Sequence, residues 1–458
     1  MSYFILDPSQ VVHVPCGMNA ALLGELLSGY TQGTAFEVVA DGIPNCITLG
    51  DAQNARALGV IGADSAVLDV EESSVLIVGT DAAAVVRGFI TMLEKIEYDR
   101  AGDSFYIPCG QEHERAHMAF RSVHLCLFPE TSLHFVKKCI RACGIAKYSH
   151  IVLEFWGMLK LDCMAELAWP FAHTKEEIRP LIDEAKTLGM EVIPMFNHLG
   201  HASANREMYG KHVVLDQNPR LEYLFNTHGW EWNFESEEVY DLLANVRREL
   251  IELCGEGSYF HLGCDEAYSL GYGENHAESL CRYLNRIAAE LRGQGRRTII
   301  WGDMLLLRRD YINEPQKYSC NMENEQIYRT LIEGLDKDII IADWQYHLTC
   351  DEWKSSTALK EAGFDVICCP WDTQSNARSA IVNVRHQDLL GIMHTTWHTL
   401  SKGFPIMLYS GRAAYSGETE IKPKEIRFSA AEVARRVLPA QGVYENAGWS
   451  EKAVGPGL

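Results

Sequence analysis

The sequence predicts an α/β protein, a (β/α)8 TIM barrel preceded by a small α+β domain. Two observations lead to this prediction. From about residue 113, short apolar strands alternate with amphipathic helix patterns, and this unit occurs eight times. Near-continuous apolar strands are typical of a parallel sheet buried on both faces. No glycine-rich phosphate loop follows any of these strands, which favours a closed barrel over a doubly wound open sheet.

The predicted barrel strands are short runs of mainly apolar residues. They span residues 120–127, 149–156, 190–196, 259–265, 297–303, 338–344, 364–371 and 389–397. Helix patterns lie between them at 130–144, 237–255 and 278–293. Thr174 with Glu177 three residues later has the form of a capping box, which predicts the start of another helix. We therefore place the barrel at residues 113–416.

Residues 1–112 predict the small α+β domain. Strand-like pieces at 36–42 and 73–79 precede an Ala-rich helix pattern from Asp81 to about Glu97, with Asp81 or Thr80 as N-cap. The polar stretch 109–117 interrupts the hydrophobic periodicity and is the expected boundary. Residues 417–458, with a helix pattern at 430–438, form a C-terminal segment. It either packs on the barrel or makes a subunit contact, as in a homodimer.

The charge and the absence of targeting signals narrow the class of protein. Acidic residues outnumber basic ones 62 to 41, for a net charge of −21. This charge repels phosphate backbones and anionic lipid surfaces, so we expect neither a nucleic-acid nor a membrane partner. The N-terminus lacks the pattern of a secretory signal, and no apolar run is long enough for a transmembrane helix. We expect a soluble, cytoplasmic protein.

The cysteine and histidine spacing does not suggest a metal site. The fourteen cysteines form no CxxC pairs. No HxH motif ends the first strand, and the histidines lie on different strands without ligand spacing. We expect no metal and no cofactor, and the free thiols suit a reducing compartment.

Polar and aromatic residues crowd the carboxyl ends of the predicted strands, where barrel active sites are built. Tryptophans there suit a cup that stacks on the apolar face of a sugar ring or encloses a small apolar group, although each one can instead close the barrel mouth as packing. The strand-end residues are Glu154, Trp156, Asn197, His198, Asp265, Glu266, Trp301, Asp303, Trp344, Tyr346, Trp371, Asp372, Trp397 and His398.

Two adjacent carboxylates, Asp265 and Glu266, end the fourth strand. Successive residues of a regular strand face opposite sides, so both acids can reach the barrel mouth only where the chain begins to turn. Gly263 permits close approach of neighbouring groups there. The alternative is that the two acids only interact with the N-terminus of the next helix.

The run His261-Leu262-Gly263-Cys264-Asp265-Glu266 resembles the H-x-G-x-D-E motif of the family 20 glycoside hydrolases, the β-N-acetylhexosaminidases. Its continuation to Tyr268, Leu270 and Gly271 is similar to the hexosaminidase D branch. Residues 191–201, 299–305 and 343–346 resemble the family's segments at the third, fifth and sixth strands. The resemblance implies a retaining exo-β-N-acetylhexosaminidase that needs no enzyme nucleophile, because the substrate's own acetamide oxygen attacks the anomeric carbon to give an oxazolinium intermediate.

The resemblance also implies roles for individual residues. Glu266 is the general acid and then the base, and Asp265 holds the acetamide N–H and offsets positive charge. His201 orients Glu266, in a chain that ends in a second-strand carboxylate for which Glu154 is the candidate. A structural role for His201 is the alternative.

The implied substrate-binding residues come from several strands. Arg121 matches the arginine of the family's R-G-x-x-L-D pattern, which reaches the sugar's 3- and 4-hydroxyls, although Cys126 replaces the final acid here. The expected acetamide pocket and its surroundings comprise Trp301, Asp303, Trp344, Tyr346 and Trp397. In the connection 200–235, Trp230 or Trp232 either stacks on a leaving sugar or packs inside the loop.

One departure from the family bears on specificity. Trp397-His398-Thr399 stands where many members have W-x-E, whose glutamate binds the 4- and 6-hydroxyls. We therefore expect a small glycan or glycoconjugate with terminal β-linked N-acetylgalactosamine and/or N-acetylglucosamine as substrate. The alternatives are a non-catalytic carbohydrate-binding protein on the same barrel, and a metal-dependent barrel hydrolase.

Overall fold

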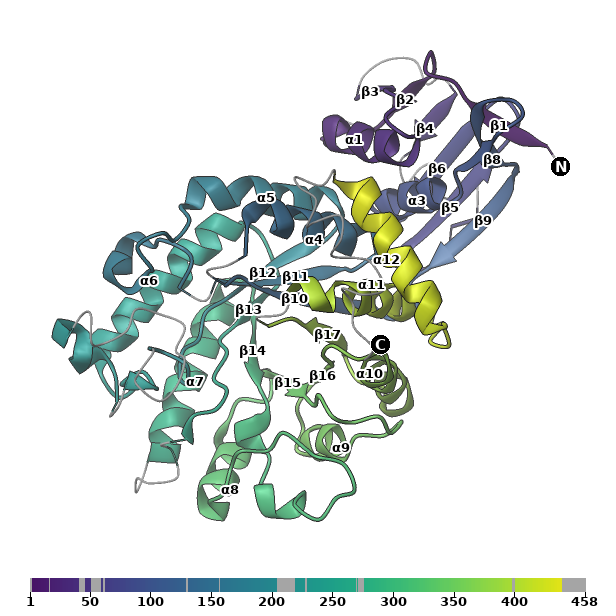
Figure 1. Ribbon diagram of the computed structural model, residues 1–458. Helices are drawn as coiled ribbons and strands as arrows, with labels where there is room; N and C mark the ends of the chain where they lie inside the picture. Colours follow the sequence, from purple (N-terminus) through teal and green to yellow (C-terminus); the bar gives the residue numbers. More distant parts are fainter. Residues whose placement is uncertain are drawn as a thin grey trace.

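The structure is a computed structural model of the 458-residue chain (Figure 1). It describes residues 2–15, 17–40, 46–50, 59–60, 62–128, 131–155, 157–203, 219–226, 229–268, 270, 276–397 and 400–438. No helix in these ranges is both long and apolar enough to cross a bilayer.

Eight parallel strands close into a barrel, which confirms the predicted fold class and every predicted barrel strand (Figure 1). Each strand pairs with the next in chain order, and the first pairs with the last, with Phe120 opposite Gly391. The strands are β10 (Phe120–Cys126), β11 (His150–Glu154), β12 (Glu191–Met195), β13 (Tyr259–His261), β14 (Arg297–Trp301), β15 (Ile340–Trp344), β16 (Val366–Cys369) and β17 (Gly391–Thr395).

A helix follows each barrel strand and covers the outside of the barrel (Figure 1). Thr174 and Glu177 form the predicted capping box, in which each side chain accepts the other's backbone N–H. Ser132 and Ser236 cap two further helices. The helices are α4 (Leu133–Ile145), α5 (Lys175–Thr187), α6 (Glu237–Cys254), α7 (His276–Gly293), α8 (Glu325–Gly334), α9 (Lys354–Glu361), α10 (Gln374–Gln387) and α11 (Leu400–Ser416).

Alternate residues of each strand fill the barrel interior. Because side chains alternate along a strand, Phe120 faces inward and its neighbour Arg121 faces the surrounding layer. The apolar interior consists of Phe120, Val152, Ile193, Met195, Ile299, Trp301, Ile340, Ala342, Ile367, Cys369 and Met393.

The N-terminal domain contains two sheets. One has the order β1-β8-β7 and the other β3-β2-β4-β6-β5-β9, and α1 (Ala20–Tyr30) and α3 (Ala82–Glu94) pack with the larger sheet. Asp81 is the N-cap of α3, as predicted. The strands are β1 (Tyr3–Leu6), β2 (Val11–His13), β3 (Glu37–Val39), β4 (Ile47–Leu49), β5 (Ser65–Val70), β6 (Val75–Gly79), β7 (Glu97–Asp99), β8 (Ser104–Pro108) and β9 (Gly110–Arg115).

The polar stretch expected at the domain boundary is itself a strand. β9 pairs antiparallel with β5 over Gly110–Arg115, so a boundary at residue 112 falls inside the small sheet. β9 is an edge strand without a buried side chain, which is why it has no apolar periodicity to reveal it. The domains meet between residue 115 and the start of β10.

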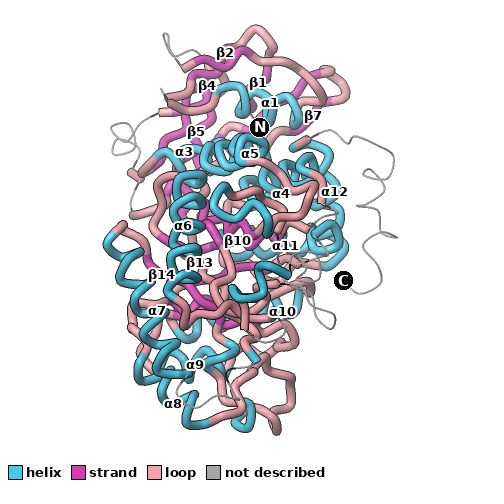
Figure 2. The backbone as a smooth tube through the Cα atoms, turned by 90° about the vertical axis from the view of Figure 1, so that its left-hand side faces the viewer, coloured by secondary structure: helices cyan, strands magenta, loops and turns pink. Residues whose placement is uncertain are grey.

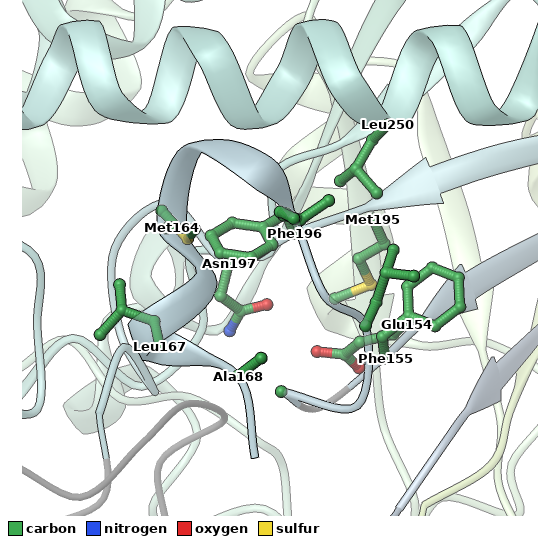
Figure 3. Close-up of a pocket in the computed structure, with 12 residues that line it drawn as sticks. Glu154, Phe155, Met164, Leu167, Ala168, Met195, Phe196, Asn197 and Leu250 are labelled. Atoms are coloured by element: carbon green, nitrogen blue, oxygen red, sulfur yellow. The ribbon is translucent and has the colours of Figure 1, made fainter. Parts of the chain in front are cut away.

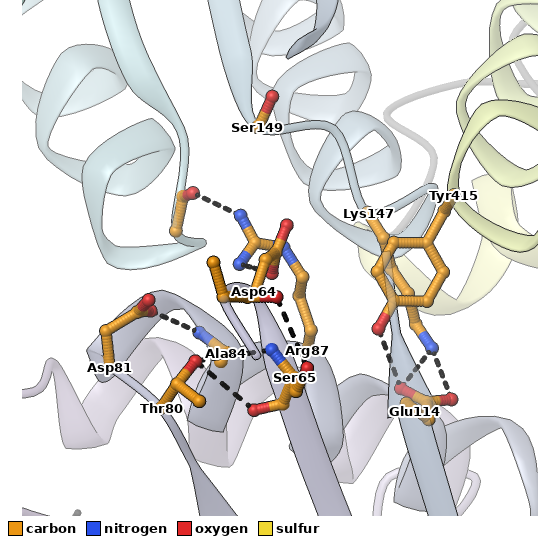
Figure 4. Close-up of polar contacts among 12 residues, drawn as sticks. Asp64, Ser65, Thr80, Asp81, Ala84, Arg87, Glu114, Lys147, Ser149 and Tyr415 are labelled. Atoms are coloured by element: carbon orange, nitrogen blue, oxygen red, sulfur yellow. Dashed lines mark hydrogen bonds and ion pairs between the residues drawn. The ribbon is translucent and has the colours of Figure 1, made fainter. Parts of the chain in front are cut away.

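Two clusters of charged side chains join the domains (Figure 4). In one, the Asp64 carboxylate pairs with Arg87 at 2.6 Å and with Arg121 of the barrel at 2.8 Å. In the other, the Glu114 carboxylate of β9 accepts hydrogen bonds from Lys147 at 2.9 Å and from the Tyr415 hydroxyl at 3.2 Å, and both groups point at it in Figure 4.

The C-terminal segment contains α12 (Pro423–Val437), which packs against α1, α4 and α11 (Figure 2). It therefore bridges the two domains. The sequence left open whether this segment packs on the barrel or makes a subunit contact. Its described part packs within the chain. Close backbone contact is part of this packing, since a Cβ on Gly29 would lie 1.9 Å from the Arg436 carbonyl oxygen.

Candidate active site

A tight turn follows β13 and carries the two adjacent carboxylates. Regular strand pairing ends at His261, and three of the next five residues have positive φ: Gly263 (69°), Cys264 (73°) and Glu266 (53°). Such conformations are costly for residues other than glycine and cluster at functional sites. The chain thus turns at the two acids, as predicted, and both Asp265 and Glu266 can approach the barrel mouth.

Two glycines allow the turns after β12 and β13 to touch. A Cβ on Gly263 would lie 2.2 Å from Asn197 Oδ1, and a Cβ on Gly200 would lie 2.1 Å from the Asp265 carbonyl oxygen. Neither contact is compatible with a side chain. Asn197 and Gly200 therefore lie in direct contact with the backbone of the turn that carries the carboxylates.

Asp265 is buried and held from two sides. Its Oδ1 accepts a hydrogen bond from Asn197 Nδ2 at 3.0 Å, and its Oδ2 lies 3.3 Å from His201 Nε2. The Asn197 amide also donates to the Gly200 carbonyl oxygen at 3.1 Å. The carboxylate therefore has a fixed orientation in the mouth.

Glu266 is the more exposed of the two acids, with 28% of its side chain accessible. Its Oε2 lies 2.9 Å from His201 Nε2, so one imidazole nitrogen faces both carboxylates. The Tyr268 hydroxyl also hydrogen-bonds this carboxylate, and burial together with the Glu266 charge raises the pKa of Tyr268. The structure thus brings Asp265, Glu266 and His201 together.

Two tryptophans donate hydrogen bonds to the backbone of the turns after β13 and β12. Trp230 Nε1 donates to the Glu266 carbonyl oxygen at 2.8 Å, and Trp232 Nε1 donates to the Asn197 carbonyl oxygen at 2.8 Å. Both side chains are buried, which agrees with packing inside the loop and not with stacking on a leaving sugar. Residues 204–218 and 227–228 of the connection lie outside the described residues.

Asp303, at the end of β14, lies beneath the Glu266 backbone. Its Oδ2 accepts hydrogen bonds from the Glu266 N–H at 2.9 Å and from Asn321 Nδ2 at 2.8 Å, and its Oδ1 accepts one from Trp344 Nε1 at 3.0 Å. Burial, and then the charge of Asp265, raise the pKa of Asp303 to about 7 against the opposing effect of these donors. Asn321 had no sequence signal, because it lies in an irregular segment before α8.

The predicted aromatic wall forms beside the carboxylates. The ring centroids of Trp301 and Trp397 are 6.0 Å apart, and those of Trp344 and Tyr346 are 5.1 Å apart. Trp397 Nε1 donates to the Tyr346 hydroxyl at 3.0 Å. Burial above all, with a smaller contribution from the nearby Asp265 carboxylate, raises the pKa of Tyr346. Trp156 and His398 lie outside the described residues.

Glu154 has a partner that was not anticipated. Its Oε2 lies 2.8 Å from Nε2 of His124, and both side chains are buried. The link from Glu154 to His201 stays a prediction. Glu154 and Asn197 also point into a cavity of about 30 Å³ (Figure 3). The other lining residues are Phe155, Gly157, Leu159, Leu161, Met164, Leu167, Ala168, Met195, Phe196 and Leu250.

The predicted sugar-binding role of Arg121 is wrong. The side chain is fully buried near the start of β10, the opposite end of the barrel from Asp265. Its Nη2 pairs with Asp64 at 2.8 Å, and its Nε donates to the Lys147 carbonyl oxygen at 3.0 Å. Since Arg121 faces out of the barrel, the arginine joins the two domains instead of reaching the mouth.

Comparison with curated proteins finds hexosaminidases. Hexosaminidase D of Bos taurus is 29% identical over 147 residues, which are 29% of this chain and 40% of that protein. Beta-hexosaminidase subunit A1 of Dictyostelium discoideum is 21% identical over 320 residues, which are 62% of this chain and 55% of that protein. The chain therefore spans about half or less of the length of these two relatives.

Solved structures with the same fold cover nearly the whole chain. A mutant Streptomyces plicatus beta-hexosaminidase in complex with product (GlcNAc) superposes with a TM-score of 0.67 at 16% identity, over 98% of this chain and 93% of that one. A GH20 exo beta-N-acetylglucosaminidase from Vibrio harveyi, in complex with N-acetylglucosamine, gives 0.67 at 16% identity, over 96% and 76%. These similarities establish the fold.

The family follows from the sequence itself. The family model described as "Glycosyl hydrolase family 20, catalytic domain" matches residues 153–398, which is more than half of the 458 residues. The match runs from the second barrel strand to the end of the eighth and includes the whole Asp265–Glu266 turn. The chain therefore belongs to glycosyl hydrolase family 20.

Proposed function

We propose that this protein is a retaining exo-β-N-acetylhexosaminidase that works by substrate-assisted catalysis. The observation that carries the proposal is the pair of adjacent carboxylates, Asp265 and Glu266, which share one imidazole nitrogen of His201 at 3.3 and 2.9 Å. The substrate's acetamide oxygen is the nucleophile and forms an oxazolinium ion with retention at the anomeric carbon.

Glu266 serves as the acid and then as the base. It protonates the leaving glycosidic oxygen and afterwards takes a proton from the water that opens the oxazolinium ring. Its partial exposure and its contacts with His201 and Tyr268 suit a carboxyl group that exchanges protons with substrate and water. The positive φ of Glu266 and the hydrogen bond from its N–H to Asp303 support a fixed position for this group.

Asp265 holds the acetamide group in place for attack. Its carboxylate accepts the acetamide N–H and offsets the positive charge that develops as the ring closes. Burial and the hydrogen bond from Asn197 keep it from turning toward water. The nearby Tyr346 hydroxyl donates to the acetamide oxygen, and the walls formed by Trp301, Trp344 and Trp397 enclose the acetamide methyl group.

The test is hydrolysis of a nitrophenyl β-N-acetylhexosaminide by the wild type, Glu266→Gln and Asp265→Asn. We expect each substitution to lower kcat by about 10² to 10⁴-fold, and a thiazoline analogue of the oxazolinium ion to inhibit the wild type. Glu252→Gln, on the exposed face of α6, is the control and should keep full activity. A wild type that binds the analogue but never releases nitrophenol would instead identify the non-catalytic carbohydrate-binding alternative.

We further propose that the enzyme accepts β-galactosaminides at least as well as β-glucosaminides. The two sugars differ at the 4-hydroxyl, and the sequence has Trp397-His398-Thr399 where many family members have W-x-E. His398 and Thr399 lie outside the described residues, so sequence alone supports this step. The measurement is kcat/KM on the two nitrophenyl glycosides, and a strong preference for the glucosaminide would refute it.

A further inference from the structure

Three buried side chains with metal-ligand atoms meet at the carboxyl end of β10 and β11. They are His124, Cys126 and Glu154, with exposures of 0%, 0% and 2%. One potential ligand atom from each lies within 4.8 Å of those of the other two. The hydrolytic mechanism proposed above assigns no role to His124 or Cys126.

The barrel register explains how these three residues converge. His124 and Cys126 are two positions apart on β10, so both point to the same side of the strand. Glu154 is the residue of β11 directly paired with Cys126. The motif His124-Leu125-Cys126 is neither a CxxC nor an HxH, and its third member comes from another strand, so the spacing rules applied to the sequence miss it.

The surroundings of His124 suit a metal ligand. Its Nε2 lies 2.8 Å from Glu154, while its Nδ1 is buried without a hydrogen-bond partner among the residues that the structure describes. The ring lies 4.9 Å from the Trp397 ring and 5.9 Å from the Trp301 ring, which keep solvent away. Buried carboxylates in proteins are paired or coordinate a metal ion.

We propose that His124, Cys126 and Glu154 bind one divalent transition-metal ion of the zinc class. An imidazole nitrogen, a thiolate and a carboxylate oxygen form a ligand set of intermediate softness, which suits Zn²⁺ and Co²⁺ and not Mg²⁺ or Ca²⁺. Three protein ligands leave the fourth position of a tetrahedral ion open. Binding replaces the hydrogen bond between His124 and Glu154 and releases the thiol proton of Cys126 to solvent.

The test uses the untagged full chain, first stripped with a chelator and then titrated with Co²⁺. Coordination by Cys126 predicts a thiolate-to-cobalt charge-transfer absorption that saturates at one equivalent and disappears on addition of Zn²⁺. Cys126→Ala should lose this absorption, whereas Cys281→Ala, a matched buried cysteine on α7, should keep it. Absence of saturable binding to the wild type, or an unchanged absorption in Cys126→Ala, would overturn the proposal.

Two further variants keep the test decisive if Cys126→Ala does not fold. His124→Gln and Glu154→Gln each remove one ligand at nearly constant volume, and each should weaken Zn²⁺ binding by about tenfold or more. Zn²⁺ affinity is measured by competition with a chromophoric chelator, on samples with wild-type circular dichroism. Wild-type affinity in both variants would contradict the assignment of these ligands.

Discussion

At Gly263 the absence of a side chain keeps the turn that carries Asp265 and Glu266 in position. The residue has a φ of 69°, and a Cβ there would lie 2.2 Å from Asn197 Oδ1, the amide group that holds Asp265. Asn197 cannot retreat freely, because its amide also bonds the Gly200 carbonyl oxygen. Substitution at this position therefore disturbs Asp265 without replacing either Asp265 or Glu266.

We expect Gly263→Ala to lower kcat/KM by about 10²-fold, since displacements of about 1 Å in a catalytic constellation have effects of this size. The measurement is hydrolysis of a nitrophenyl β-N-acetylhexosaminide, with chemical denaturation to show that the variant is folded at the assay temperature. Gly293→Ala is the control, because a Cβ there meets nothing within 4 Å. Equal activity of Gly263→Ala and the wild type would contradict the prediction.

Asp303 gives the stability of the protein a specific pH dependence. Its pKa is about 7 in the folded protein, raised from an ordinary value of 3.8, first by burial and then by Asp265. A raised carboxyl pKa favours folding at pH values below the ordinary value, and this contribution disappears as the pH rises through 7. Asp303→Asn removes the titration.

The free energy of unfolding of the wild type, measured relative to Asp303→Asn, should therefore fall by on the order of 3 kcal/mol between pH 4 and pH 8. Urea denaturation at several pH values provides the measurement. Asp310→Asn, whose native side chain is 57% exposed, controls for the substitution itself. A difference that stays constant over this range, or rises with pH, would show that Asp303 is ionised throughout.

Among the elements, the loop between β11 and α5 depends on helix α6 for its position. Glu249 of α6 accepts hydrogen bonds from the backbone N–H groups of Asp162 and Cys163, both at 2.8 Å, and pairs with Lys175 at 2.9 Å. Burial tends to raise the pKa of Glu249, but the hydrogen bonds from Lys175, Cys163 and the Asp162 backbone outweigh it and lower the pKa to about 2. This loop forms one wall of the cavity beside Glu154.

We expect Glu249→Gln to lower the free energy of unfolding at pH 7 by about 2 kcal/mol, the usual range for hydrogen bonds to a charged group. A lowered carboxyl pKa stabilises the fold above the ordinary value of 4.5 and loses that effect as the pH falls toward 2. The difference in free energy of unfolding between the wild type and Glu249→Gln should therefore become smaller below pH 4.5. Chemical denaturation at several pH values measures it. Glu252→Gln, exposed on the same helix, should show no difference at either pH.

The elements that sequence predicts well are those buried on both faces. All eight barrel strands were predictable because parallel strands of this kind are continuous apolar runs, and α5 was predictable from the side chains of its capping box. β9 was not, since an edge strand with polar residues on both faces has no hydrophobic period. The predicted end of β13 was four residues late, because the turn residues there are themselves buried.

The candidate site was predictable to the extent that it lies in contiguous motifs. Asp265, Glu266 and His201 come from two such motifs, and the structure brings them within hydrogen-bond reach. The predicted role of Arg121 was wrong because it depends on which face of β10 the side chain occupies, and the motif match did not specify that face. Asn321 belongs to the site only through the three-dimensional path of an irregular segment.

For the whole molecule, the ion pairs of Asp64 are one of the polar links between the small domain and the barrel. Asp64 lies in the N-terminal domain and Arg121 in the barrel, where the guanidinium is fully buried. Loss of Asp64 leaves the fully buried Arg121 guanidinium without its carboxylate, which costs far more than loss of a surface pair. Asp265 and Glu266 lie at the other end of the strands.

Asp64→Ala should lower the free energy of unfolding by about 3 kcal/mol and leave KM unchanged. Arg121→Ala should behave alike, and the double variant should be less destabilised than the sum of the two, as a double-mutant cycle would reveal. Arg248→Ala removes only an exposed ion pair and should change stability by less than about 1 kcal/mol. A raised KM with unchanged stability in Arg121→Ala would restore the sugar-binding role for this arginine.

The position of α12 has a consequence for the order in which the chain folds during synthesis. Arg141 of α4 donates to the Val437 carbonyl oxygen at 2.9 Å, and the Arg436 guanidinium lies over the ring of Tyr30, 4.7 Å from its centroid. The first helix of the protein and the first helix of the barrel thus share a partner that leaves the ribosome some 400 residues after Tyr30. Until then Tyr30 and the outer face of α4 stay uncovered, so a nascent chain stalled before residue 423 should present both to chaperones.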